Sequence, residues 1–246
     1  MRIRNPYFLA GLASVITGSL LVLLGQFIFL VNWLTALGVV LLILSLIFFV
    51  LGRTVPKLPP AYSRLLLETG MNNISAMVEE LGINTRAIYL PAGMTGGRSR
   101  ALIPLHDGFT RPQWQETPPD RMIVRYGESP DDVGLMVTTV GTAAVAMLGQ
   151  KPGETLPELE AALNLLVSGT LGVADGVGVS ESQGQVVVEI NRPHIELEQL
   201  WSDRCLGGPL ASLVAAVTAF TMNYSVQVAS EERVGDKYRV ELKVLA

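Results

Sequence analysis

The chain has 246 residues, of which 49% are hydrophobic and 16% are charged, with a formal net charge of −4 and one cysteine. No acidic residue occurs before Glu68, so the part from there onward holds all 22 acidic residues against 13 of the 18 lysines and arginines, a net charge of −9. Because nucleic-acid binding depends on basic residues that neutralise phosphates, this acidic part excludes a general nucleic-acid binder, and the lone cysteine excludes an internal disulfide.

Two uncharged apolar runs, residues 7–31 and 34–51, open the chain. A helix needs about 20 apolar residues to cross roughly 30 Å of hydrocarbon, so each run is long enough to span a membrane. Between the runs, Asn32 favours a turn and Trp33 favours a membrane interface. The sequence therefore predicts a transmembrane helical hairpin over residues 1–53 that contacts the lipid bilayer through residues 7–51. A cleaved signal peptide is the alternative for the first run, but its apolar region is only about 7–15 residues long.

Small residues recur at seven-residue spacing in both predicted spans, where they allow two helix backbones to approach closely in lipid. If the hairpin turns between residues 31 and 32, positions whose numbers sum to 63 lie at the same depth. This register predicts that Gly18 faces Ser45 and that Gly25 faces Gly38.

Basic residues indicate the orientation of the hairpin. Arg2 and Arg4 precede the first predicted span, Arg53 and Lys57 follow the second, and the connecting loop has no charge. Short loops rich in lysine and arginine stay on the cytoplasmic side. The sequence therefore predicts a multi-pass cell-membrane protein with two spans and both termini in the cytoplasm.

Residues 54–60 form a proline-rich linker that does not continue the second helix, and residues 61–246 are predicted to be a cytoplasmic domain. An amphipathic helix over residues 61–82 opens this domain, with Ile74 and Leu81 on its apolar face. A subdivision of the domain near residue 150 stays open.

The rest of the domain alternates between strand and helix patterns. Thr142 is expected to be the N-cap of a short helix, and the order helix–strand–strand, which occurs twice in the C-terminal part, favours an α+β fold in which helices cover one face of an antiparallel sheet. The expected helices cover residues 156–167 and 209–222, and the expected strands cover residues 86–90, 101–105, 122–126, 133–139, 173–180, 185–191, 225–231 and 237–245.

Candidate catalytic residues are few. Cys205 lies just before an apolar helix whose N-terminus would favour a thiolate, and His194 would be its general base, although nothing in the sequence brings the two together. A buried cysteine that packs as a small apolar residue is the alternative. Two histidines far apart in the sequence do not make a zinc site, so we expect no metal and no cofactor.

A segment rich in arginine between residues 86 and 125 is a candidate surface for the membrane or for a partner. Arg98, Arg100 and Arg111 lie in this segment, where anionic lipid headgroups would attract them. Trp114 is the aromatic residue that we expect to anchor a partner. A solvated surface without any partner is the alternative for these residues.

The segments Arg86-Ala-Ile-Tyr-Leu-Pro91 and Leu102-Ile-Pro-Leu105, with Cys205 ahead of Pro209-Leu-Ala-Ser-Leu213, resemble uncharacterised prokaryotic membrane proteins, archaeal ones included. The resemblance implies an N-terminal two-helix hairpin and a cytosolic α+β domain, and it implies no functional residues.

Three functions are compatible with these patterns. The first is a membrane-anchored cytoplasmic module for protein interaction or sensing, with an unknown protein partner. The second is a binding domain for a small apolar or anionic ligand in a pocket beneath the helix at residues 210–222. The third is an enzyme that depends on Cys205. Whether the chain forms a homo-oligomer stays open.

Overall fold

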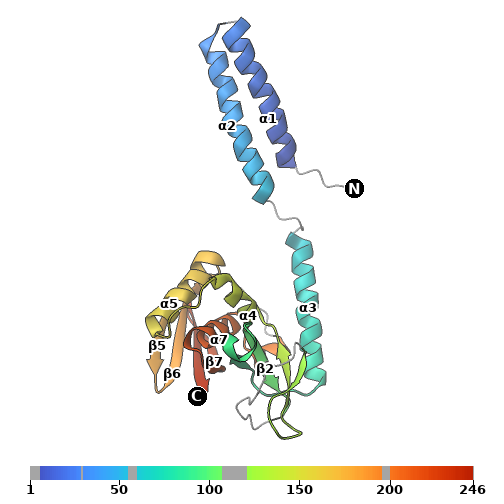
Figure 1. Cartoon of the computed structure of the whole chain (residues 1–246), viewed down its shortest axis with the longest axis vertical. Helices are drawn as coiled ribbons and strands as arrows, with labels where there is room; N and C mark the ends of the chain where they lie inside the picture. Colours follow the sequence, from blue (N-terminus) through green and yellow to red (C-terminus); the bar gives the residue numbers. More distant parts are fainter. Residues whose placement is uncertain (1–5, 29, 55–59, 107–120, 196–199, 246) are drawn as a thin grey trace. The chain divides into compact units, whose positions relative to one another are not determined.

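The computed structural model describes residues 6–28, 30–54, 60–106, 121–195 and 200–245. The chain divides into two compact units, Met1–Glu68 and Thr69–Ala246 (Figure 1). The boundary lies inside one helix rather than in the proline-rich linker. Each unit is described by itself.

The first unit is the expected apolar hairpin. Helix α1 (Pro6–Leu23) continues into a π-helical turn, η1 (Leu24–Ile28), and packs along α2 (Asn32–Thr54). The Phe8 and Phe49 rings meet edge to face with their centroids 5.5 Å apart. By length and composition, the stretches Tyr7–Ile28 and Asn32–Arg53 could each span a membrane.

The register of this hairpin differs from the predicted one. A Cβ on Gly18 would lie 2.9 Å from the Gly38 carbonyl oxygen, and a Cβ on Gly25 would lie 2.8 Å from the Thr35 backbone nitrogen. Gly18 therefore packs against Gly38 and not against Ser45, and Gly25 packs against Thr35 and not against Gly38. The prediction was wrong because it placed a sharp turn between residues 31 and 32, whereas α2 already begins at Asn32 and the connection precedes it.

Helix α3 (Pro60–Glu80) forms where the amphipathic pattern predicts a helix. Among its described side chains, only those of Ser75 and Val78 are buried. Ser75 Oγ accepts a hydrogen bond of 3.1 Å from the Ser202 backbone N–H. Ile74 and Leu81, on the apolar face, are 46% and 57% exposed. The apolar face is therefore wider than the surface that the domain covers.

The second unit contains one eight-stranded antiparallel sheet, as the sequence predicts. Its strand order is β3-β4-β2-β1-β7-β8-β6-β5, so strands from both sides of residue 150 belong to the same sheet. The strands are β1 (Ile88–Leu90), β2 (Arg100–Pro104), β3 (Ile123–Arg125), β4 (Val133–Val137), β5 (Ala174–Ser182), β6 (Gln185–Pro193), β7 (Ser225–Val234) and β8 (Lys237–Leu245).

Helices cover one face of this sheet, again as predicted (Figure 1). The central helix, α7 (Pro209–Met222), packs against β1, β7 and β8, and almost all of its residues are buried. Helices α4 (Val140–Val145) and α5 (Leu156–Asn164) pack against α7, and the short helix α6 (Trp201–Leu206) precedes it.

The start of α4 corrects one prediction. Its N-cap is Thr139, whose hydroxyl accepts from the Thr142 N–H at 3.2 Å, while the Thr142 hydroxyl accepts from the Thr139 N–H at 2.7 Å. Thr142 is therefore the third residue of a reciprocal capping box and not the N-cap itself.

The two halves of the sheet differ on the face away from α7. On β1–β4 this face carries a second buried apolar cluster, which includes Ile88, Leu102 and Met136. On β6 and β8 it carries charged pairs across the strands, such as Lys237 with Glu189 at 2.7 Å. The β5 edge is covered by α5, because the Asn164 side chain accepts from the Val177 N–H and donates to its carbonyl.

Candidate functional site

A cavity of about 550 Å³ lies where α6, the start of α7 and strands β6, β7 and β8 meet. We call it the junction pocket. Its size falls within the range of small-molecule sites, about 300–1,000 Å³. The residues that line it are Pro193, Ile195, Leu200, Trp201, Asp203, Arg204, Gly208, Pro209, Leu210, Glu231, Glu232, Arg233 and Tyr238.

A β-bulge in β7 brings Glu231 into this pocket. Before the bulge, Val228 lies opposite Leu242 on the face that packs against α7. The register then shifts between Val228 and Ser230, so that Glu231 lies opposite the core residue Val240 on the same face. Without the extra residue, the strict alternation of a strand would turn Glu231 to the other face.

Arg86 holds the bulge in place. Its guanidinium Nη1 donates to the Val228 carbonyl at 2.8 Å and also to the Ala229 carbonyl. The same arginine lines a second hollow, of about 220 Å³, that shares Asp203, Arg204 and Glu231 with the junction pocket. The polar residues of α6 and β7 therefore form a wall between two hollows.

The Glu231 carboxylate is the centre of the hydrogen bonds in the junction pocket. The Gly208 backbone N–H lies 3.1 and 3.0 Å from its two oxygens, and the Tyr238 hydroxyl donates to it at 2.6 Å. Gly208 is the N-cap of α7, so Glu231 is an internal anion at the positive end of that helix. An external anion would have to compete with this carboxylate.

Asp203, Arg204 and Trp201 form the α6 side of the wall. The Asp203 carboxylate accepts from the Leu200 N–H at 3.0 Å. Burial raises the pKa of Asp203, the hydrogen bond from Leu200 lowers it, and the negative charge of Glu231 raises it further. The Arg204 guanidinium lies over the Trp201 ring, 4.5 Å from its centroid, in a cation–π contact.

This arrangement suits binding better than proton transfer. Burial raises the pKa of Tyr238 above its usual range, and its hydrogen bond to Glu231 raises it further, so the hydroxyl stays protonated and serves as a donor. The Glu231 oxygens are already hydrogen-bonded. The described residues contain no group of three or more His, Cys, Asp or Glu side chains that could hold a metal ion.

Cys205 lies in the core next to this wall. Its thiol donates to the Ile83 carbonyl oxygen at 3.2 Å, and its side chain is 3% exposed. Burial raises the pKa of the Cys205 thiol, the opposite of the lowering that a nucleophile at a helix N-terminus would need. The cysteine ends up in α6 and faces the core, which matches the interpretation of a small apolar residue.

The hydrogen bonds of His194 are made with residues other than Cys205. Its Nε2 lies 3.0 Å from Asp175 Oδ1, and its Nδ1 lies 3.3 Å from the Gly172 carbonyl oxygen. Asp175 also pairs with Arg192 at 3.2 Å. These contacts place His194 in an exposed cluster with Asp175 and Arg192, next to β5 and β6.

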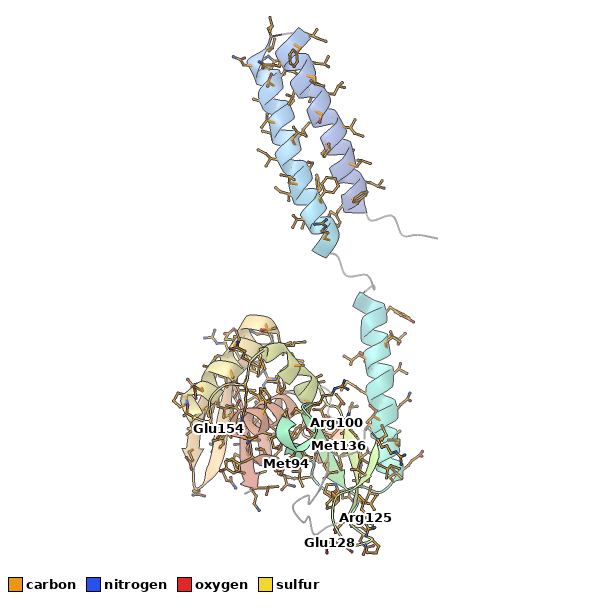
Figure 2. The ribbon with its side chains drawn as sticks, in the orientation of Figure 1. Met94, Arg100, Arg125, Glu128, Met136 and Glu154 are labelled. Atoms are coloured by element: carbon orange, nitrogen blue, oxygen red, sulfur yellow. The ribbon has the colours of Figure 1, made fainter. Side chains whose placement is uncertain are left out.

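The arginine segment is only partly described. Arg98 is exposed in the loop before β2. Arg100, labelled in Figure 2, is half-buried at the start of β2. Arg111 and Trp114 lie outside the described residues. The hypothesis that these four residues face lipid or a partner stays a prediction.

Sequence reasoning missed the residues that line the junction pocket. The strands that carry Glu231 and Tyr238 are predicted, but the bulge that turns Glu231 inward has no sequence signature. Helix α6, with Trp201, Asp203 and Arg204, is only six residues long, too short for a periodic pattern. The available signal is Gly207-Gly208-Pro209, which marks a break before α7.

Comparisons with known proteins place the chain in a family. A family model described as "Domain of unknown function (DUF7982)" matches residues 8–243. No curated protein and no solved structure matches the sequence. The match agrees with the resemblance to uncharacterised proteins, while the prokaryotic or archaeal origin stays a prediction. Because the matched range includes both the hairpin and the α+β domain, the chain belongs to this family of unknown function.

Proposed function

We propose that the chain is a multi-pass cell-membrane protein with two spans and both termini in the cytoplasm, and that its α+β domain acts as an interaction or sensing module rather than as an enzyme. The apolar hairpin supports the anchor. Arg53 in the last turn of α2, together with Arg2, Arg4 and Lys57 in the sequence, supports the orientation.

The junction pocket is the observation that carries the binding role. Its lining combines the apolar side chains of Ile195, Leu200 and Leu210 with polar side chains. Glu231 is oriented by Gly208 and Tyr238, as described above. Such pre-organisation lowers the ordering cost of binding.

The lining favours a ligand with charge over a wholly apolar one. Among the described residues, the lining contains three carboxylates, from Asp203, Glu231 and Glu232, and two guanidinium groups, from Arg204 and Arg233. A small molecule with an apolar body and charges of both signs would find a partner for each part. The buried residues of α7 argue against the alternative of an apolar ligand beneath that helix.

Native mass spectrometry of the full chain in lipid nanodiscs would test this proposal. We expect a bound small molecule on the wild-type protein and on Lys243→Ala, an exposed site on β8 outside the pocket lining. The double variant Glu232→Ala/Arg233→Ala changes two exposed residues of the pocket and should lose that mass. Absence of bound mass from all three proteins, together with no thermal stabilisation by a panel of zwitterionic metabolites, would contradict the binding role.

The orientation has a separate test in intact cells. We expect a cysteine placed at Asn32, the first residue of α2 next to the connection between the spans, to react with a membrane-impermeant maleimide added outside. A cysteine placed at Lys151, on the domain surface, should react only after permeabilisation. The reverse pattern would place the domain outside the cytoplasm.

A further inference from the structure

Helix α3 carries an apolar stripe that is exposed in the part of the chain that the structure describes. Ile74, Met77 and Leu81 are 46%, 37% and 57% exposed, and Leu67 is 59% exposed. The neighbouring stripe of the same helix, with Ser75 and Val78, is buried. The uncovered stripe therefore lies beside the domain contact and is not part of it.

The spacing of this stripe fits a second helix. Leu67, Gly70, Ile74, Met77 and Leu81 follow one another at intervals of three, four, three and four residues. This average of 3.5 is the repeat of the a and d positions in a left-handed coiled coil. Nothing lies within 4 Å of the position that a Cβ on Gly70 would take, so the stripe is open to a neighbouring backbone at this residue.

The charges on α3 argue against a lipid surface as the partner of this apolar stripe. Helices that lie on anionic membranes usually carry lysine or arginine on their polar face. The polar face of α3 carries Glu68, Glu79 and Glu80, and after Arg64 near the start of the helix no lysine or arginine occurs before Arg86. An anionic bilayer would repel this face, whereas an apolar seam between two helices leaves it in water.

We propose that α3 pairs in parallel with α3 of a second copy of this chain, through the seam Leu67, Gly70, Ile74, Met77 and Leu81. The parallel direction rests on the proposed membrane anchor. Two copies whose α3 helices follow α2 in the same membrane have the N-terminal ends of these helices on the same side. The anchor also raises the local concentration of the two α3 helices. This supports pairing because a contact of only two heptads is marginally stable on its own.

Disulfide cross-linking of the full chain in native membranes would test this pairing. Leu67→Cys, Ile74→Cys and Leu81→Cys place thiols along the seam, and Asn72→Cys and Glu79→Cys place matched thiols on the exposed opposite side. Cys205 is kept, because it is buried, and the wild-type chain measures its background. Under mild oxidation we expect disulfide dimers at all three seam positions to form at least about tenfold faster than at the two control positions.

The pattern of cross-links separates the alternatives. Leu67 and Leu81 are each seven residues from Ile74, so an antiparallel pair would join only the Ile74 cysteines and would overturn the parallel arrangement. Equal rates at seam and control positions would reduce the contact to random collision. Absence of dimers, with seam thiols shielded from a water-soluble maleimide and control thiols reactive, would assign the stripe to lipid. Each of these results contradicts the proposal.

A second variant tests the seam without a cysteine at its centre. Because Ile74 is exposed in the single chain, Ile74→Lys should leave the domain folded, while it places two like charges across the seam. In the Leu81→Cys chain we expect it to abolish the fast cross-link. Fractionation of the same cells shows whether the chain is in the membrane, so a failed anchor is distinguishable from a failed seam.

Discussion

The two helices of the hairpin and the α6–α7 segment form apolar stretches of the same length, 22 residues, but they differ in how much of each is buried in the protein. All three stretches are long and apolar enough to cross a membrane, the third over Trp201–Met222. In their most apolar windows, 17% and 11% of the first two stretches are buried, against 72% of the third. A helix that is apolar on all sides needs either lipid or a protein core around it. The α6–α7 segment has the core.

A local feature of the sequence accompanies this difference. The third stretch is interrupted at Gly207-Gly208-Pro209, where α6 ends and α7 begins, so α7 alone has only 14 residues. Such a helix is about 21 Å long, too short for roughly 30 Å of hydrocarbon. The sheet packs against this helix, and Glu231 from β7 supplies the hydrogen-bond acceptor at its N-terminal end.

The largest effect is expected from a charge in the centre of α7. Ala215 is fully buried, and Ala215→Asp would place an unpaired carboxylate in the core. We expect a loss of more than about 4 kcal/mol in the free energy of unfolding, enough to leave the domain unfolded. Protease resistance and circular dichroism of the purified chain would measure it. Val234→Asp, at an exposed position, should change stability by less than about 0.5 kcal/mol, and a folded Ala215→Asp protein would contradict the core assignment of α7.

The opposite pattern is expected from a charge in the centre of α2. Ile43 is 56% exposed, and Ile43→Lys should cost about 2.5–3.5 kcal/mol of membrane insertion. The fraction of chain that resists extraction by alkaline carbonate should fall, while the thermal unfolding of the α+β domain stays unchanged. Ile43→Leu is the matched control. If Ile43→Lys unfolded the domain and left the membrane fraction unchanged, α2 would be a core helix.

A third contrast concerns two glycines, one where two helices touch and one in an open position of a strand. A Cβ on Gly141 in α4 would lie 2.0 Å from the Ser212 carbonyl oxygen in α7, a backbone atom that cannot move aside easily. We expect Gly141→Ala to destabilise the domain by about 2–3 kcal/mol. A Cβ on Gly178 in β5 would meet nothing within 4 Å, so Gly178→Ala should be neutral or slightly stabilising. Equal melting temperatures for the two variants would show that α4 and α7 can separate without cost.

These contrasts also show what the sequence can predict. The apolar runs, the break between the expected strands 225–231 and 237–245, and helix α7 are encoded by neighbouring residues, so their patterns locate them correctly. Gly235 adopts the left-handed backbone, with φ of 61°, in the break between these two strands. Local signals of this kind account for the hairpin, the antiparallel sheet and the layer of helices.

Features that depend on distant partners were not predictable in the same way. The depth at which Gly18 meets Gly38 depends on the path of the connection between the two helices, and the inward turn of Glu231 depends on a bulge held by Arg86, far away in the sequence. The junction pocket combines α6, α7 and three strands. Its residues become neighbours only once the sheet has formed.

The smallest effect is expected at the wall of this pocket and appears as a pH dependence. Because the pKa of Asp203 is raised in the folded state, the folded protein takes up a proton at a higher pH than the unfolded chain does. This carboxylate therefore lowers stability near neutral pH, and the penalty disappears as the pH falls below the unfolded value of about 4. Asp203→Asn keeps an oxygen that can accept from the Leu200 N–H but removes the charge near Glu231.

We expect Asp203→Asn to be more stable than the wild type at pH 7, by less than about 1 kcal/mol because solvent screens a half-buried group. The difference should shrink towards zero as the pH falls to about 4. Urea unfolding of both proteins at a series of pH values would measure it. Glu232→Gln, an exposed neighbour in the same pocket, is the control and should show no such trend. A variant that is less stable than the wild type at neutral pH would mean that the hydrogen bond to Leu200 outweighs the burial of the Asp203 charge, and the wall would then depend on that carboxylate for its structure.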